Sequence, residues 1–291
     1  MAFVALAAVV ALVLMVRLLR GRAWSAVESR HPVGPDGVIV GAAGYELARP
    51  DAPAVLLFHG AGDTPQTVRY LAEELYERGF HVAAPLLPGH GRTIREFSQV
   101  TADALTTAAF ESYRALRDRH TWVGIIGVSM GGALAVQVAA ATPDLPALGL
   151  VAPYLAMRPR ASRLARTSHV WGVLVPAFAS AEGFSIHDPD ERKKSLAYGA
   201  FTAGALRALY ATVRRAALAL PRVAAPTLVI QSREDNRIEI DDAEQAFARL
   251  GAREKRLEWV TGAAHIITVD YGRERVIEML ASWMEGKLVS R

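Results

Sequence analysis

The sequence predicts an α/β fold in which a mostly parallel sheet carries helices on both faces and a small inserted cap. Two observations predict it. Short apolar runs that are typical of buried strands alternate with amphipathic helical stretches along most of the chain. About seventy residues, far more than an ordinary crossover needs, separate a strand that ends near Ala152 from one that begins at Thr227. The cap is therefore expected at about residues 154–221.

The N-terminal residues 1–22 predict a membrane anchor. Residues 2–16 carry no charge and are followed by Arg17, Arg20 and Arg22. A helix of that length rises about 22 Å, short of the roughly 30 Å hydrocarbon layer, but two further leucines extend it and arginine side chains can snorkel. The positive charges follow the apolar run, whereas a signal peptide has them before it. We therefore expect an uncleaved single-pass transmembrane helix, with the rest of the chain on the cytoplasmic side.

Composition excludes several classes of site. The chain has no cysteine, which excludes disulfides, a thiol nucleophile and cysteine-ligated zinc. Its net charge of +4 is concentrated next to the predicted anchor and within the predicted cap. This placement favours a surface that faces anionic lipid over a nucleic-acid footprint, with a simple solvated basic face as the alternative.

A linker rich in proline and glycine is expected at residues 23–37, and the main domain at 38–291. The first half of the domain begins with a hairpin over residues 38–47. After a buried strand, Thr64 and Pro65 have the chemistry of a helix start, and Gly79 can end that helix. The expected elements after the hairpin are a strand over 54–58, a helix from 64 to 79, a strand over 80–84 and a helix over 101–119.

The second half continues the same alternation and surrounds the cap. Its expected elements are strands over 122–128, 147–151, 227–231 and 255–260, and helices over 130–142, 241–250 and 271–285. Within the cap, an apolar stretch over 171–178 and a helix that carries Leu206, Leu209, Tyr210 and Val213 should pack on the main domain. Strands that alternate with helices predict a parallel sheet covered on both faces.

The segment Gly127-Val128-Ser129-Met130-Gly131 has the pattern of a nucleophile elbow. It follows an apolar run and opens an alanine-rich helical stretch. A sharp turn can lift a serine hydroxyl above the sheet only if its neighbours are small, which the two glycines satisfy. The alternative is a glycine turn that merely joins a strand to a helix, as in dinucleotide folds, but the GxGxxG pattern is absent and a serine holds the centre.

Serine is a weak nucleophile at neutral pH and needs an imidazole base oriented by a carboxylate. His265 and Asp235 each follow a predicted strand, so both should lie at the carboxyl edge of the sheet beside Ser129. Glu234 and Asp241 are the alternative acids. The other candidates have structural interpretations: Asp270 as a helix N-cap, and histidines without a paired motif at His31, His81, His120, His169 and His187.

The loop His59-Gly60-Ala61 follows the strand over 54–58 and should lie beside the elbow. The backbone amides of Ala61 and Met130 are the expected oxyanion hole, because they would point at the oxygen that gains charge in a tetrahedral intermediate. His59 and His90 are then expected to brace loops rather than act as bases.

Taken together, these blocks resemble the α/β-hydrolase superfamily, and more narrowly the bacterial carboxylesterases and monoacylglycerol lipases with a small cap. The resemblance covers about residues 53–285. It implies the α/β-hydrolase fold, Ser129 as nucleophile, Asp235 and His265 as its triad partners, and an acyl pocket under the cap. Ala61 stands where these esterases often have a large aromatic residue, and Ser232 replaces a glycine often found before the acid. Neither departure removes a catalytic group.

The expected function is hydrolysis of a carboxylic ester through an acyl-enzyme, with a lipid-derived small molecule as substrate and no cofactor, metal or nucleic acid. The metal-binding HExxH pattern is missing. Acyl transfer to another acceptor uses the same triad and stays open. A membrane-docked binding protein that keeps the fold without catalysis is the alternative from another class.

Overall fold

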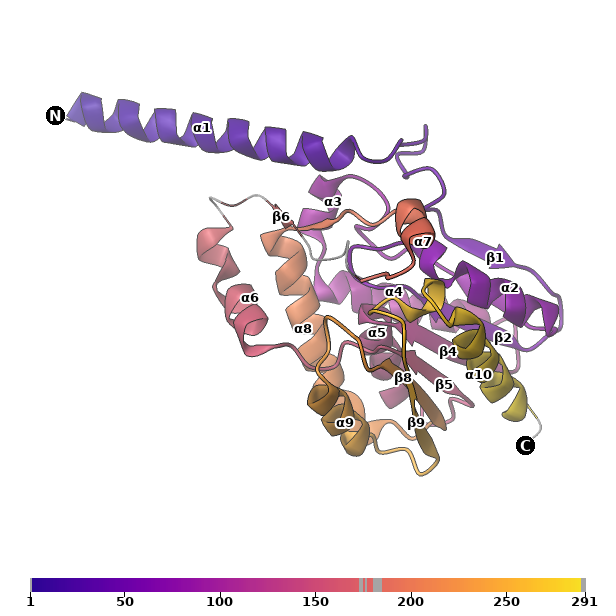
Figure 1. Cartoon of the computed structure of the whole chain (residues 1–291). Helices are drawn as coiled ribbons and strands as arrows, with labels where there is room; N and C mark the ends of the chain where they lie inside the picture. Colours follow the sequence, from indigo (N-terminus) through magenta and orange to yellow (C-terminus); the bar gives the residue numbers. More distant parts are fainter. Residues whose placement is uncertain (1, 173–174, 176, 180–184, 289–291) are drawn as a thin grey trace.

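The computed structural model describes residues 2–172, 175, 177–179 and 185–288. Within them, a seven-stranded sheet has the order β1-β3-β2-β4-β5-β8-β9 (Figure 1). Only the edge strand β1 runs antiparallel to its neighbour, so the prediction of a mostly parallel sheet is confirmed. The strands are β1 (Tyr45–Leu47), β2 (Ala54–Phe58), β3 (His81–Ala84), β4 (Val123–Val128), β5 (Leu148–Val151), β8 (Thr227–Ser232) and β9 (Lys255–Val260).

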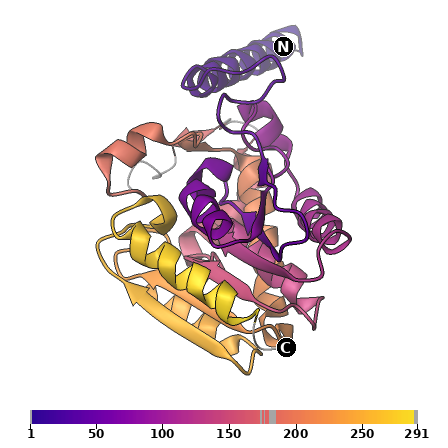
Figure 2. The same ribbon diagram turned by 90° about the vertical axis from the view of Figure 1, so that its right-hand side faces the viewer.

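Helices cover both faces of this sheet (Figure 2). One face carries α4, α5 and α8, which contact one another, and the other carries α2 and α10. The helices of the main domain are α2 (Arg69–Glu77), α3 (Ile94–Gln99), α4 (Ala102–Arg117), α5 (Met130–Ala140), α9 (Ile240–Arg249) and α10 (Arg273–Gly286), with short 3-10 turns η1 (Pro65–Val68), η3 (Leu220–Arg222) and η4 (Ile267–Val269).

The central strands are buried on both faces. In β2, Leu56 and Phe58 pack with α4 and α5, whereas Val55 and Leu57 pack with α2 and α10, and all four side chains are fully buried. Successive side chains of a strand point to opposite faces, so a strand between two helical layers must be apolar throughout. This is why β2 and β4 are continuous apolar runs in the sequence.

The cap consists of α6 (Pro159–Trp171), β6 (Phe178–Ala179), α7 (Pro189–Lys194), β7 (Ala200–Phe201) and α8 (Ala203–Ala219). The predicted helix around Leu206 and Leu209 is α8, which packs on α5 and α6. The strands β6 and β7 pair antiparallel, which sets Phe178 opposite Phe201. Part of the apolar stretch predicted over 171–178, namely 173, 174 and 176, lies outside the described residues.

The N-terminal residues form one helix, α1 (Ala2–Glu28), which lies across the domain and extends beyond it (Figure 1). It runs six residues into the segment predicted as a linker. Its last turns are part of the domain, because Val27 is buried in a cluster with Phe97 and Tyr198. Among the described residues, no helix combines the length and hydropathy that crossing a bilayer requires. The structure therefore does not support the predicted transmembrane helix over residues 1–22.

One further sequence prediction is wrong, and one helix is found that the sequence analysis does not predict. Residues 38–47 do not form a hairpin: only Tyr45–Leu47 form a strand, and it pairs with β3. The helix α3 was not predicted, although Thr93 and Glu96 form a capping box at its start. In both segments the local sequence pattern is only a few residues long, so long-range packing decides which secondary structure forms.

Candidate active site

Ser129 lies at the turn between β4 and α5 in a backbone conformation that non-glycine residues rarely adopt, with φ of +54°. The turn is possible because its neighbours lack side chains. A Cβ on Gly127 would lie 2.3 Å from the carbonyl oxygen of Gly131, and one on Gly131 would lie 2.2 Å from that of Phe58. Packing around the turn maintains this strained backbone conformation, and the turn places the serine side chain above the carboxyl edge of the sheet.

The structure brings Ser129, His265 and Asp235 into one hydrogen-bonded chain. The Nε2 atom of His265 lies 2.8 Å from Ser129 Oγ, and its Nδ1 atom lies 2.8 Å from Asp235 Oδ2. A carboxylate only accepts, so Nδ1 carries the hydrogen and Nε2 can accept the serine proton. The side chains of His265 and Asp235 are only 6% and 1% exposed, which removes competing water from both bonds.

Asp235 is held as a carboxylate. Burial raises its pKa. The charge of His265 and the hydrogen bonds from His265 and from the amides of Arg237 and Ile238 lower the pKa by more than burial raises it, so the pKa of Asp235 lies below its ordinary value. Both oxygens are used: Oδ1 accepts from these two amides at 2.7 and 3.0 Å, and Oδ2 also accepts from Gln231.

The alternative acids occupy other positions. Glu234 accepts from the amide of Gly262 at 3.2 Å and from the hydroxyl of Ser232, so it braces the loop that leads to His265. Asp241 lies in the exposed first turn of α9. Of the three candidate acids, Asp235 is therefore the one that contacts the imidazole.

Asp270 organises the site in a way that the sequence did not predict. It is fully buried and accepts from four backbone amides, at 2.7 Å from Ala264, 2.8 Å from each of His187 and Asp188, and 2.9 Å from Tyr271. The predicted N-cap role is wrong, because α10 begins at Arg273 after Gly272. Asp270 instead joins the loop that carries His265 to the cap segment just before α7, at His187 and Asp188.

The loop after β2 is braced by a neutral histidine, as predicted. His59 Nε2 accepts from the amide of Leu87 at 3.1 Å, so Nδ1 carries the hydrogen and donates to Gly60 O at 2.9 Å. Burial lowers the pKa of His59 to about 3, with a further contribution from the nearby His90. Ala61 lines the same pocket as Ser129, and Met130 is the first residue of α5, whose N-terminal amides favour negative charge.

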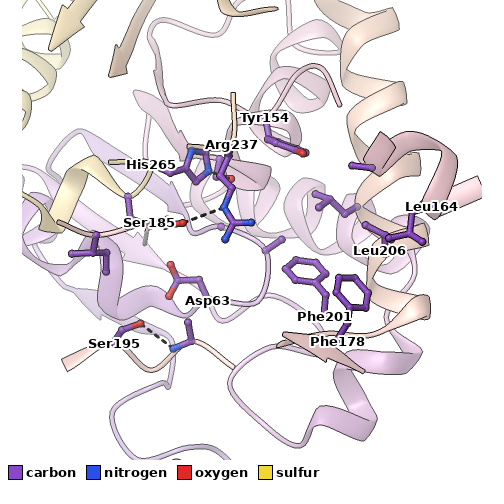
Figure 3. Close-up of a pocket in the computed structure, with 18 residues that line it drawn as sticks. Asp63, Tyr154, Leu164, Phe178, Ser185, Ser195, Phe201, Leu206, Arg237 and His265 are labelled. Carbon is purple, nitrogen blue, oxygen red and sulfur yellow. Dashed lines mark hydrogen bonds between the residues drawn. The ribbon is translucent and has the colours of Figure 1, made fainter. Parts of the chain in front are cut away.

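A cavity of about 280 Å³ opens beside Ser129 and is covered by the cap (Figure 3). One side is apolar and carries Leu164, Phe178, Phe201 and Leu206. The opposite side, next to His265, carries Asp63, Ser185, Ser195 and Arg237. A ligand with one apolar end and one polar end would therefore fit across the serine.

The histidines for which the sequence predicted a structural role lie outside this pocket. His31 contacts the carbonyl of Ala197, His120 that of Ala52 and His187 that of Gly262, while His81 and His169 are a strand residue and a residue of α6. In the part of the chain that the structure describes, no group of three or more histidine or acidic side chains could hold a metal ion.

The chain is similar in sequence to known proteins. The profile of a family described as serine aminopeptidase S33 matches residues 49–271. A thermostable monoacylglycerol lipase of Bacillus sp. strain H-257 is 29% identical over 77% of this chain and 87% of its own length. A carboxylesterase of Bacillus subtilis strain 168 is 27% identical over 80% of this chain and 92% of its own length.

Solved structures are similar as well. A structure reported with the metagenome-derived lipolytic enzymes LipS and LipT superposes with a TM-score of 0.78 at 29% identity, over 88% of this chain and 100% of that one. A monoacylglycerol lipase of Paleococcus ferrophilus, at 21% identity, gives a TM-score of 0.73 over 84% of this chain and 98% of that one and shares the fold.

Proposed function

We propose that this chain, which belongs to the serine aminopeptidase S33 family of α/β-hydrolases, cleaves carboxylic esters by way of an acyl-enzyme on Ser129. The observation that carries the proposal is the position of His265, within hydrogen-bond reach of both Ser129 Oγ and Asp235. The two similar curated proteins are ester-cleaving enzymes by name, which supports an ester over an amide.

In the first half of the reaction, Ser129 Oγ attacks the ester carbonyl carbon while its proton passes to His265 Nε2. Asp235 stabilises the imidazolium that forms. When the tetrahedral intermediate collapses, the carbon–oxygen bond to the alcohol breaks and His265 gives its proton to the leaving alkoxide. In the second half, water attacks the acyl-enzyme while it loses a proton to His265. The bond between the acyl carbon and Ser129 Oγ then breaks, and His265 returns the proton to Ser129 Oγ as the acid is released.

The developing oxyanion has a defined place in this scheme. We assign its stabilisation to the backbone amides of Ala61 and Met130, which border the pocket and the start of α5. Loss of one such donor typically costs about 3 kcal/mol of transition-state stabilisation.

The apolar side of the pocket supports an acyl chain of medium length as the preferred group. Phe178 and Phe201 from the paired cap strands and Leu164 and Leu206 from the cap helices line it. An acyl chain gains about 0.8 kcal/mol per methylene that it buries there. We therefore propose a monoacylglycerol or lysolipid as the substrate class.

A graded ester series tests this proposal. The chain should hydrolyse octanoyl and decanoyl esters faster than acetyl esters, and Ser129→Ala should abolish both activities while the protein stays folded. A strong preference for acetyl, or turnover that survives Ser129→Ala, would contradict it. An aminoacyl arylamide in the same panel separates ester from peptide-type cleavage, and added glycerol separates hydrolysis from acyl transfer.

We also propose that α1 attaches the protein to the cytoplasmic face of a membrane. Its described apolar side chains are unusually exposed: Val4 is 73% and Leu14 59% exposed. Exposed apolar surface of this extent marks a contact site. The full chain should co-sediment with anionic vesicles, and Leu14→Asp should weaken this binding, whereas Leu218→Asp, at an exposed leucine of α8, should not. Equal binding by both variants would contradict the proposal.

A further inference from the structure

A buried glutamine donates a hydrogen bond to the acid of the triad. Gln231 lies near the carboxyl end of β8 and is only 1% exposed. Its Nε2 atom donates to Asp235 Oδ2 at 2.7 Å, and Nδ1 of His265 lies 2.8 Å from the same oxygen. An ionised carboxylate accepts and does not donate, so the amide of Gln231 must present its nitrogen. Gln231 and the imidazole therefore share one oxygen of the carboxylate.

The other end of this amide indicates that the bond serves the site rather than the fold. Among the described residues, the buried Oε1 atom of Gln231 has no hydrogen-bond partner. Gln137 of α5 is also buried but uses both ends: Oε1 accepts from Thr106, and Nε2 donates to the carbonyls of Ala133 and Thr212. An unpaired buried acceptor costs folding free energy. An apolar side chain of the same length would avoid that cost, so stability alone does not account for a glutamine at 231.

The effect of the bond on His265 follows from electrostatics. The N–H group of Gln231 places the positive end of its dipole at Asp235 Oδ2, where it offsets part of the negative charge that the imidazole meets. Less negative charge beside an imidazole disfavours its protonated form. Only the unprotonated ring can accept the proton of Ser129. The bond from Gln231 therefore keeps the base of the free enzyme available at lower pH.

We propose that Gln231 is a positioning residue that acts through Asp235: it offsets part of the carboxylate charge at His265, so that ester cleavage extends to lower pH. This inference rests on the proposed function and adds to it a residue that sets the pH range of the site. The amides of Arg237 and Ile238 hold the other carboxylate oxygen. The position of Asp235 should therefore survive the loss of Gln231, and the charge at Oδ2 is the property that changes.

Other ionisable groups lie around His265, and their effects have to be separated from that of Gln231. The ring of Tyr154 lies edge-on, with its centroid 6.4 Å from that of His265, and burial raises its pKa. Arg237 and Asp63 line the same pocket (Figure 3), and Asp270 holds the His265 loop through a backbone amide. Burial raises the pKa of Asp63 to about 7, so its carboxyl group changes charge within the pH range of the test. Asp63 is therefore the group that the test controls.

The test measures kcat/KM of the whole chain for 1-decanoylglycerol, a neutral ester, between pH 5 and pH 9 and below its micellar concentration. The readout is the pH at which kcat/KM falls to half of its plateau on the acid side. Gln231→Met removes both the donor and the unpaired acceptor and keeps the length of the side chain. The midpoint should rise by about 0.5 unit, which is a loss of about threefold in kcat/KM well below the midpoint. The plateau should change less, because two amides still hold Asp235.

Two controls separate this effect from loss of stability and from Asp63. Gln137→Met is the same substitution at the other buried glutamine. It should lower the melting temperature, because the hydrogen bonds of that amide are lost, and leave the midpoint unchanged. Gln231→Met should instead keep a melting temperature close to that of the wild type. In an Asp63→Asn background, the rise in midpoint that Gln231→Met causes should keep its size.

The outcomes distinguish this inference from the proposed function. An unchanged or lower midpoint in Gln231→Met, or a rise that disappears in the Asp63→Asn background, would overturn the inference, while Ser129-dependent turnover by the wild type upholds the proposed function. If neither Gln231→Met nor Gln231→Leu folds, the fold itself requires the glutamine, and the inference is overturned as well. Absence of Ser129-dependent turnover in the wild type would overturn both.

Discussion

The carboxyl edge of the sheet and the cap above it are held together in different ways. At the edge, three loops are fixed by short hydrogen bonds to the buried carboxylates of Asp235 and Asp270. The described part of the cap also packs through apolar side chains such as Leu209 and Phe201. Asp270 binds the amide of His187, and Arg30 binds the carbonyl of Tyr198, which fastens the later part of the cap to the domain. The difference separates two tasks: the edge fixes the geometry of the reacting atoms, and the cap shapes the space for the substrate.

The largest effect is expected from a substitution at the carboxyl edge of the sheet that removes the acid of the triad. Asp235→Asn removes the carboxylate that orients His265, and such a change lowers kcat by about 10⁴-fold in serine hydrolases with this triad. Asp241→Asn is the matched control, because the same substitution falls in the exposed first turn of α9. Steady-state kinetics on a decanoyl ester should show the full loss for the first variant and a change of less than about twofold for the second. Similar losses in both would contradict the assignment of the acid.

The next effect concerns the close approach of chains at the elbow. Gly131→Ala would place a Cβ 2.2 Å from the carbonyl oxygen of Phe58, which is backbone and cannot move aside cheaply. We expect it to lower the free energy of unfolding by about 3 kcal/mol. Gly286→Ala, where a Cβ meets nothing within 4 Å, should not destabilise the fold. Urea denaturation measures both, and an unaffected Gly131→Ala protein would show that the elbow tolerates rearrangement.

A smaller effect should follow from loosening the link between edge and cap. Asp270→Asn keeps the shape of the side chain but replaces an acceptor of four amides with a group that also donates. We expect a loss of about 2 kcal/mol in stability and a lower kcat, because the His265 loop is held less firmly. Asp190→Asn, at a largely exposed position of α7, is the control for urea denaturation and kinetics. Full stability in the Asp270 variant would show that the cap and the edge are independent.

The smallest effect is expected where the segment after α1 meets the cap. Arg30 Nη1 donates to the carbonyl of Tyr198 at 2.8 Å, and the amide of Tyr198 donates to Gly62 O at 3.1 Å, beside the proposed oxyanion loop. Arg30→Ala should lower the unfolding free energy by about 1 kcal/mol, since the bond is only partly buried. Arg22→Ala, at an exposed position of α1, should have no measurable effect in the same thermal-unfolding experiment.

The same comparison explains what the sequence predicts well. Ser129, Asp235 and His265 follow β4, β8 and β9, and parallel strands end at a common edge, so recognising these three strands in the sequence is enough to bring the residues together. Asp270 was misassigned because its partners His187 and Asp188 come from the cap, more than 80 residues away in the chain. The path of residues 38–47 was wrong because β1 pairs with β3, a contact that no short pattern encodes. Arg237 was not identified at all, since only the folded loop turns it toward the pocket.

Covalent labelling of the protein with a fluorophosphonate, followed by mass spectrometry, tests directly whether Ser129 is the activated nucleophile. We predict one phosphonyl adduct, located on Ser129 in the peptide that follows β4, and none in Ser129→Ala. An unlabelled wild-type protein, or an adduct that persists on another residue in the variant, would contradict the assignment of Ser129 as the activated nucleophile.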